Sequence, residues 1–364
     1  MPRVLRGVSR PRPVNAGRGS SEKELHFSTS TLMHHTQARV AARRHRMAGL
    51  TLLELLVVLT ILVVLSTVVF TTSSGMINKT RDEMTKRVMS DIREAVIGPS
   101  DYRDPDGVPV AFGFLNDLGR PPKAAVDSVA GGQIFTLREL WQNVHATAIY
   151  EARRATAANV DDPAQEDPDV ILATGWRGPY LRSAFTDGEL KDGWGSALVS
   201  PDGVLEEYPN ALLRTITNNR ISAAGQEIGQ VDSPGANPSG RPSETGYDID
   251  LNAYTPSDTV ATMPVSVEVR KADGTLATPV GTDQIVVRLF GPNPDTGFIK
   301  VQHREEDFTA GTFSISFSTT PGERVLRAYY DKDKDGSVES KSAIAHANVR
   351  TGPNTPRLIV LTIP

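Results

Sequence analysis

Residues 49–54 read Gly-Leu-Thr-Leu-Leu-Glu and open an almost uninterrupted apolar run that continues to Phe70. Residues 50–70 are 21 in number. A helix of that length, rising about 1.5 Å per residue, can cross a hydrocarbon core of roughly 30 Å. Glu54 is the only formally charged residue in the run. An acidic side chain inside a membrane segment costs about 2–4 kcal/mol near the centre and less near an end, which marks Glu54 as a functional candidate. Because Glu54 lies near the start of the run, solvation by water or headgroups is the alternative explanation.

The residues ahead of the run predict its orientation. Residues 33–49 contain no acidic side chain and four arginines, namely Arg39, Arg43, Arg44 and Arg46. By the positive-inside rule this end stays in the cytoplasm and the rest of the chain is sent outward. A secretory signal peptide carries small residues after its apolar core, whereas Ala48 and Gly49 precede the core here.

This arrangement resembles the type IV prepilin family, which includes the pseudopilins of type II secretion. The family pattern is Gly, an apolar residue that is often Phe, then Thr-Leu-x-Glu, and only Leu50 departs from the commonest choice. The resemblance implies cleavage after Gly49 by a prepilin peptidase, which also methylates the new amine of Leu50. It further implies that Glu54 pairs with that amine on a neighbouring subunit, since a paired buried charge is tolerated and an unpaired one is not.

The resemblance also implies partners and a location. The partners are the prepilin peptidase, other pilin-like subunits contacted through the N-terminal helix, and the inner-membrane assembly machinery. The expected location is the inner membrane, crossed once with the N-terminus in the cytoplasm and the C-terminal domains in the periplasm. A periplasmic or extracellular filament follows on assembly.

Residues 1–49 are the predicted leader, and Met33 is an alternative translation start. Ten basic and two acidic residues precede Leu50, so removal of the leader changes the formal net charge from −4 to −12. An acidic mature chain argues against nucleic acid as a partner. The chain has no cysteine, which excludes disulfides and thiol catalysis.

After the membrane half, residues 50–70, the helical pattern continues to Pro99. Apolar residues recur at multiples of three or four with charged residues between them, which predicts an amphipathic helix. This layout resembles the long pilin helix, whose second half carries a globular domain. Residues 71–230 are therefore the predicted amphipathic helix and pseudopilin-like domain.

Four segments of this region resemble, in order, the landmarks of major pseudopilin-like domains: 114–122, 137–141, 175–181 and 192–195. The resemblance implies a small antiparallel sheet after them, for which residues 197–200 and 212–217 supply strands. The aromatic residues expected in the core are Trp176, Tyr180 and Trp194. Residues 123–169 are a predicted insertion, with a helix expected around 137–154.

Residues 221–229 resemble a loop that often holds calcium in such domains, although Ala and Gln replace the usual Gly and Asp. Glu227 and Asp232 are the remaining candidate ligands there. Residues 231–255 are rich in Pro, Gly, Ser and Asn and are the predicted linker.

Residues 256–364 show a period of two, which predicts about seven strands. The expected strands are centred on 265–269, 285–289, 298–303, 313–317, 325–330, 344–349 and 358–362. This count suggests an antiparallel, immunoglobulin-like β-sandwich without the cysteine pair. The predicted fold class is therefore α+β: a long N-terminal pilin helix with a small antiparallel sheet, followed by an all-β sandwich.

Residues 331–339 carry the one pattern in this domain that predicts metal chemistry. Asp331, Asp333 and Asp335 with Gly336 reproduce the first half of a calcium loop, in which alternate carboxylates converge on one cation. Ser337 and Glu339 are the further candidate ligands for Ca²⁺. Ser342 stands where a bidentate Glu is expected, and a solvated acidic turn without metal is the alternative.

The sequence contains no motif of a hydrolase, phosphate-binding or dinucleotide-binding enzyme, and we expect no catalysis. Two functions remain open. The first is a structural subunit of a type II secretion pseudopilus or type IV pilus-like filament involved in protein secretion. The second is a minor or tip pilin-like binding protein whose C-terminal sandwich recognises a secreted substrate or surface ligand.

Overall fold

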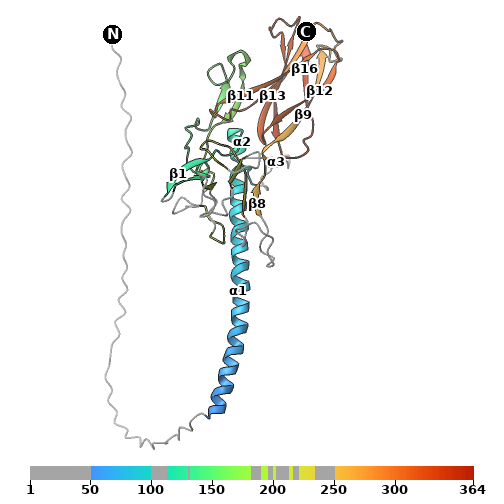
Figure 1. Cartoon of the computed structure of the whole chain (residues 1–364). Helices are drawn as coiled ribbons and strands as arrows, with labels where there is room; N and C mark the ends of the chain where they lie inside the picture. Colours follow the sequence, from blue (N-terminus) through green and yellow to red (C-terminus); the bar gives the residue numbers. More distant parts are fainter. Residues whose placement is uncertain are drawn as a thin grey trace, which may run out of the picture. The chain divides into compact units, whose positions relative to one another are not determined.

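The computed structural model describes residues 51–99, 113–129, 132–181, 190–195, 200–201, 213–215, 221–233 and 251–364. The chain forms two compact units, one ending at Leu62 and one running from Val63 to Pro364. A long N-terminal helix is followed by a region of mostly β-strands in several sheets (Figure 1). The predicted α+β class is confirmed.

Helix α1 spans Leu52–Val96, 45 residues, so the apolar and amphipathic patterns belong to one helix. Gly75 lies inside the helix without ending it. The last turns of α1 bury Met89, Ile92 and Val96. The amphipathic half therefore anchors the helix to the globular part, as its pattern predicts.

The first core forms around this end of α1. Helix α2 (Phe114–Leu118) is entirely buried there and ends at Gly119, whose left-handed φ of 67° allows its N–H to bond the Leu115 carbonyl. Trp176 and Tyr180, two of the three expected core aromatics, pack against this core and stay partly exposed. Trp194 is also half-buried.

Two small antiparallel sheets accompany this core. One contains β1 (Ala125–Val129), β2 (Gly132–Thr136) and β5 (Ser200–Pro201), and the other contains β6 (Leu213–Thr215), β7 (Ile228–Ser233) and β8 (Leu251–Tyr254). The predicted linker 231–255 thus contains strand residues at both ends. Tyr254 is fully buried, and its hydroxyl donates to the Ile228 carbonyl at 2.7 Å. Residues 234–250 lie outside the described residues, and the domain boundaries stay a prediction.

The prediction of a helix around residues 137–154 is wrong. A short 3₁₀ turn, η1 (Arg138–Leu140), is followed by strand β3 (Glu151–Ala155), η2 (Pro163–Gln165) and strand β4 (Asp167–Thr174). Strand β3 reads Glu-Ala-Arg-Arg-Ala, residues with good helix propensity, yet Arg153 and Ala155 are buried with a period of two. Packing against other strands overrides local propensity here.

Short helix α3 (Pro256–Thr259) leads into the sandwich, where all seven expected strands are present. Sheet β12–β9–β16 faces sheet β11–β10–β13, whose β13 also pairs with β14 and β15. The bounds are β9 (Ala261–Lys271), β10 (Gln284–Pro292), β11 (Ile299–Asp307), β12 (Thr312–Thr319), β13 (Gly322–Asp331), β14 (Ser340–Lys341), β15 (Ala345–Val349) and β16 (Arg357–Ile363). The core between the sheets is built from side chains that alternate along the strands, including Val265, Val267, Ile285, Val287 and Leu326.

The last strand differs from the expectation in its direction. Strand β16 pairs with β9 in parallel, whereas the sequence predicted an antiparallel sandwich. Its buried residues are Ile359 and Leu361, while Leu358 and Val360 face outward. Because residues 358–361 are all apolar, the alternation does not select a face.

The Asp-Gly-Trp-Gly turn at 192–195 contacts α1 directly. The Gly193 N–H donates to the Thr85 hydroxyl at 3.0 Å, and the Arg81 guanidinium lies 5.5 Å from the centre of the Trp194 ring. A Cβ added at Gly193 would lie 1.9 Å from the Arg81 carbonyl oxygen. Only glycine permits this close approach of turn and helix.

We therefore expect Gly193→Ala to lower the free energy of unfolding by about 1–3 kcal/mol, as overpacking against backbone does. Chemical denaturation followed by circular dichroism measures it. Gly75→Ala is the control, because Gly75 has no neighbour within 4 Å of an added Cβ and lies in a helix. That change should stabilise by about 0.5–1 kcal/mol. Equal stability of Gly193→Ala and the parent would refute the contact.

Candidate functional site

The N-terminus of α1 is a capping box. The Thr51 hydroxyl accepts a hydrogen bond from the Glu54 N–H at 3.2 Å, and Glu54 Oε2 accepts from the Thr51 N–H at 3.0 Å and from its hydroxyl at 3.1 Å. These bonds satisfy helix N–H groups that have no partner within the helix. They also hold the Glu54 carboxylate at the first turn. Gly49 and Leu50, the predicted cleavage and methylation positions, lie outside the described residues.

The apolar half of α1 is exposed along its length. From Leu52 to Phe70 the large apolar side chains are 44–84 % exposed. The polar side chains Thr60 and Thr67 bond to carbonyls of their own helix, at 2.8 Å each. The helix is long and apolar enough to cross a membrane. Glu54 is therefore the only charged group that the segment presents.

A buried carboxylate lies in the first landmark segment. Asp117 is fully buried and accepts hydrogen bonds from Asn116 Nδ2 at 2.8 Å and the Tyr180 hydroxyl at 3.0 Å. The Arg177 Nε lies 2.9 Å from Asp117 Oδ2. Burial raises the pKa of Asp117 to about 6, although Arg177 and the hydrogen bonds lower it. Sequence patterns did not single out Asp117, because Arg177 and Tyr180 lie about 60 positions away from it along the chain.

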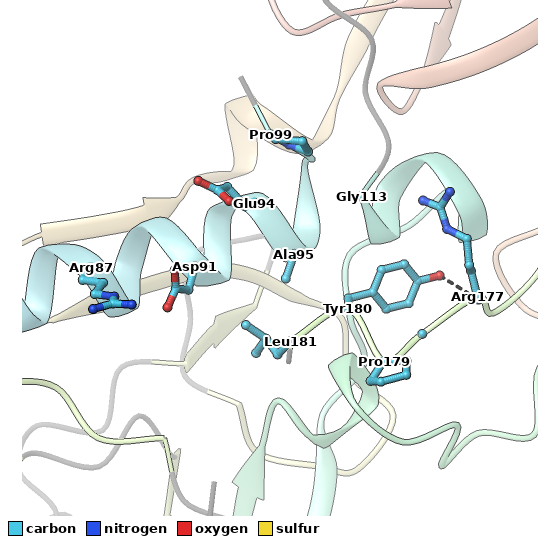
Figure 2. A pocket seen from close by; sticks show the side chains of 11 residues that line it. Arg87, Asp91, Glu94, Ala95, Pro99, Gly113, Arg177, Pro179, Tyr180 and Leu181 are labelled. Carbon is cyan, nitrogen blue, oxygen red and sulfur yellow. Dashed lines mark hydrogen bonds between the residues drawn. The ribbon is translucent and has the colours of Figure 1, made fainter. Parts of the chain in front are cut away.

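A pocket of about 930 Å³ lies between α1 and the segment that contains Tyr180 (Figure 2). Figure 2 shows Arg87, Asp91 and Glu94 along the helix, with Tyr180, Leu181 and Pro179 on the segment beside its end. Pro99, Gly113 and Leu181 of its lining each adjoin residues outside the described part of the chain. The described wall carries both charge signs and therefore selects no ligand by charge.

Of the candidate ligands Glu227 and Asp232, Glu227 lies near a buried ion pair. Arg120 and Glu139 are 2 % and 0 % exposed and are joined by two hydrogen bonds of 2.8 and 2.6 Å. Glu227 lies within the electrostatic influence of this pair, and burial raises its pKa. Calcium binding by Glu227 and Asp232 stays a prediction. For Asp232 only the backbone, in β7, is described.

The carboxylates of residues 331–339, at the end of β13 and just after it, accept hydrogen bonds from backbone N–H groups of the same segment. The Asp331 carboxylate accepts the Asp335 and Gly336 N–H groups at 3.1 Å each, and Glu339 Oε2 accepts the Lys332 N–H at 2.7 Å. Asp335 accepts the Ser337 N–H, and Asp333 has a left-handed φ of 60°. Within the described residues, no group of three or more His, Asp or Glu side chains is placed to hold a metal ion. Calcium binding by Asp331, Asp333, Asp335, Ser337 and Glu339 stays a prediction.

The pKa of Asp117 leads to a pH-dependent stability. A carboxyl with a folded pKa of about 6 and a reference value of 3.8 binds its proton more tightly in the folded state. Its contribution is therefore favourable at low pH and is lost as pH rises through 6. The lost stability amounts to about 3 kcal/mol at most.

Asp117→Asn removes this titration and keeps the side-chain size. We expect the stability of the parent to fall relative to Asp117→Asn between pH 4 and pH 7, as measured by urea denaturation at both pH values. A difference that does not change with pH would show that the Asp117 pKa is not raised.

Comparison with known families places a motif at the start of α1. A family model described as the prokaryotic N-terminal methylation motif matches residues 44–70. Neither the curated proteins nor the solved structures give a match to the chain. The matched stretch contains Gly49, Leu50 and Glu54. The motif and the apolar helix indicate a membrane-anchored type IV pilin-like or pseudopilin subunit with a structural role, processed by a prepilin peptidase and assembled with other pilin subunits.

Proposed function

We propose that the chain is a structural subunit of a type II secretion pseudopilus or type IV pilus-like filament that serves protein secretion. The prepilin peptidase cuts after Gly49 and methylates the amine of Leu50. The exposed helix then packs with the helices of other subunits. The observation that carries the proposal is the exposure of the apolar half of α1, which lies within the residues that the methylation-motif model matches.

Exposed apolar surface requires a cover. Burial of apolar surface contributes about 25 cal/mol per Å², and the side chains of residues 52–70 are uncovered within the described chain. A single helix of this length fits a bilayer before assembly. In a filament, equivalent helices of neighbouring subunits replace the lipid. The same surface thus serves both states.

Glu54 gives the subunit a different free energy in its two states, unassembled in lipid and assembled in a filament. In lipid the carboxylate has no cation near it, and its cost raises the free energy of the unassembled subunit. All its described hydrogen bonds use Oε2 or the backbone, so Oε1 has no partner among the described residues. The methylated amine of Leu50 on a neighbour is a cation that fits this oxygen. Pairing lowers the cost and sets the register of the subunits.

The secretion assignment is supported by the landmark segments at 114–122, 137–141, 175–181 and 192–195. Their residues build the core at the end of α1 and the turn that contacts it. The inner-membrane assembly machinery is the further partner in this proposal. The subunit starts in the inner membrane with a cytoplasmic N-terminus and periplasmic C-terminal domains, and ends in a periplasmic or extracellular filament.

A second function is a minor or tip subunit whose sandwich recognises a secreted substrate or surface ligand. The observation that favours it is the size of the sandwich, which adds eight strands to the pilin-like part. The outer face of sheet β12–β9–β16 presents exposed Ser314, Ser316 and Thr262 to solvent. A domain of this size is hard to accommodate at every position along a tightly packed shaft.

Glu54→Val tests the structural proposal. Loss of a buried pair by removal of one partner costs about 3–5 kcal/mol, and each 1.4 kcal/mol is about tenfold in an equilibrium. We therefore expect incorporation into sheared filaments to fall by at least about tenfold, while the protein still inserts into the membrane. Immunoblotting of filament and membrane fractions measures both.

Glu83→Gln is the matched control, because Glu83 is an exposed carboxylate on the same helix outside the apolar run. It should assemble like the parent. Normal incorporation of Glu54→Val would overturn the docking role. Gold labelling of the parent along the fibre supports a shaft subunit, whereas label confined to one end supports the tip alternative.

A further inference from the structure

We propose that the β3–β4 hairpin holds the C-terminal sandwich rigidly against the body, by which we mean residues 63–96 of α1 and the first core around their end. The sandwich is therefore a rigid extension of this part of α1 and does not move independently on a flexible linker. The hairpin lies in the predicted insertion 123–169 and its continuation to Thr174. This inference concerns the unit from Val63 to Pro364 and does not depend on filament assembly.

The first observation is a hydrophobic core shared across the joint. Four buried residues come from the hairpin region and four from the sandwich: Ala155, Val160, Val170 and Leu172 pack with Phe290, Ile299, Val301 and Val325. This cluster is separate from the core between the two sheets of the sandwich. Sheet β11–β10–β13 is therefore covered on both faces, on one by the opposite sheet and on the other by the hairpin.

Backbone hydrogen bonds continue this contact. Residues 159–161 run beside the start of β11, where Val160 and Ile299 form a parallel bridge. The Ile299 N–H donates to the Asn159 carbonyl at 2.9 Å, and the Asp161 N–H donates to the Ile299 carbonyl at 3.1 Å. Asp161 Oδ1 accepts the Val301 N–H at 2.9 Å. The hairpin region thus adds a short strand segment to the edge of the sandwich sheet.

A buried carboxylate fixes the other side of the hairpin. Asp167 is 0 % exposed, and its Oδ2 accepts from the Tyr329 hydroxyl at 2.6 Å and from Arg327 Nη1 at 2.9 Å. Lys341 Nζ lies 3.6 Å from Asp167 Oδ1. All three partners belong to the sandwich. Separation of the hairpin would leave this carboxylate or its partners uncompensated, which opposes opening.

Helix α2 and the body meet the sandwich at close range. The Asn116 Oδ1 accepts the Glu323 N–H at 2.6 Å, and a Cβ added at Gly322 would lie 2.5 Å from the same Asn116 oxygen. A Cβ added at Gly119 would lie 2.6 Å from the Pro292 carbonyl oxygen. Such approaches leave no space for the two surfaces to slide.

Strand β8 and helix α3, which directly precede the sandwich in the chain, also contact the body. Strand β8 ends in the fully buried Tyr254, and Asp258 of α3 forms an ion pair with Arg93 of α1 at 3.2 Å. Arg93 also donates to the Ala253 carbonyl. The segment next to the sandwich therefore does not act as a free tether.

The joint can be tested in the full-length protein in detergent, because the chain has no native cysteine. Ser90→Cys on α1 and Ser316→Cys on β12, both exposed positions, provide two spin-label sites. Pulsed electron–electron resonance then measures the distance distribution between helix and sandwich. The parent should give one narrow peak and one thermal unfolding transition for the unit.

Leu172→Ser is the joint variant and Ile171→Ser the matched control, since Leu172 is 3 % exposed in the shared core and its neighbour Ile171 is 44 % exposed. Leu172→Ser should broaden the distance distribution and split the thermal transition, whereas Ile171→Ser should match the parent. A broad distribution in the parent would overturn the proposal, and so would a Leu172→Ser variant indistinguishable from the control. If Leu172→Ser does not fold, the parent distribution alone decides.

Discussion

The apolar half of α1 imposes the main constraint on this molecule, because no described part of the chain covers it. A helix that exposes its leucines and valines from Leu52 to Phe70 is stable only in lipid or against other helices. The capping box of Thr51 and Glu54 starts the helix at the point where it must enter that environment. In the proposed function, cleavage, membrane insertion and assembly all act on this same short segment.

The other end of α1 shows how the globular part stays attached to such a helix. Met89, Ile92 and Val96 enter the first core, and the turn at Gly193 contacts Thr85, about one turn earlier on the same face of the helix. From there the structure continues through α2 and the β3–β4 hairpin into the sandwich without a free hinge among the described residues. Removal of residues 256–364 would expose the apolar side of the hairpin and leave Asp167 unpaired. Truncation is therefore a poor way to assign a separate role to the sandwich.

Local patterns predicted the features that depend on local chemistry. The helix from its cap to Val96 and the strands with strict alternation, such as β9 and β10, follow from periodicity and burial of one face. Strand β3 could not be predicted in this way, because tertiary packing holds its helix-forming residues in an extended conformation. The side of β16 that faces the core could not be predicted either, since all of residues 358–361 are apolar. Buried charges such as Asp117, Arg120 and Asp167 depend on partners distant in sequence, so the sequence alone carried no sign of their burial.

Residues 49–54 are, in the proposed function, a processing site that creates a docking end. Intact-mass and N-terminal peptide mass spectrometry of the protein purified from membranes of its native host tests this most directly. We expect a chain that begins at Leu50 and carries one methyl group on its amine, with residues 1–49 absent. A chain that retains the leader, or one cut after the apolar segment, would contradict it.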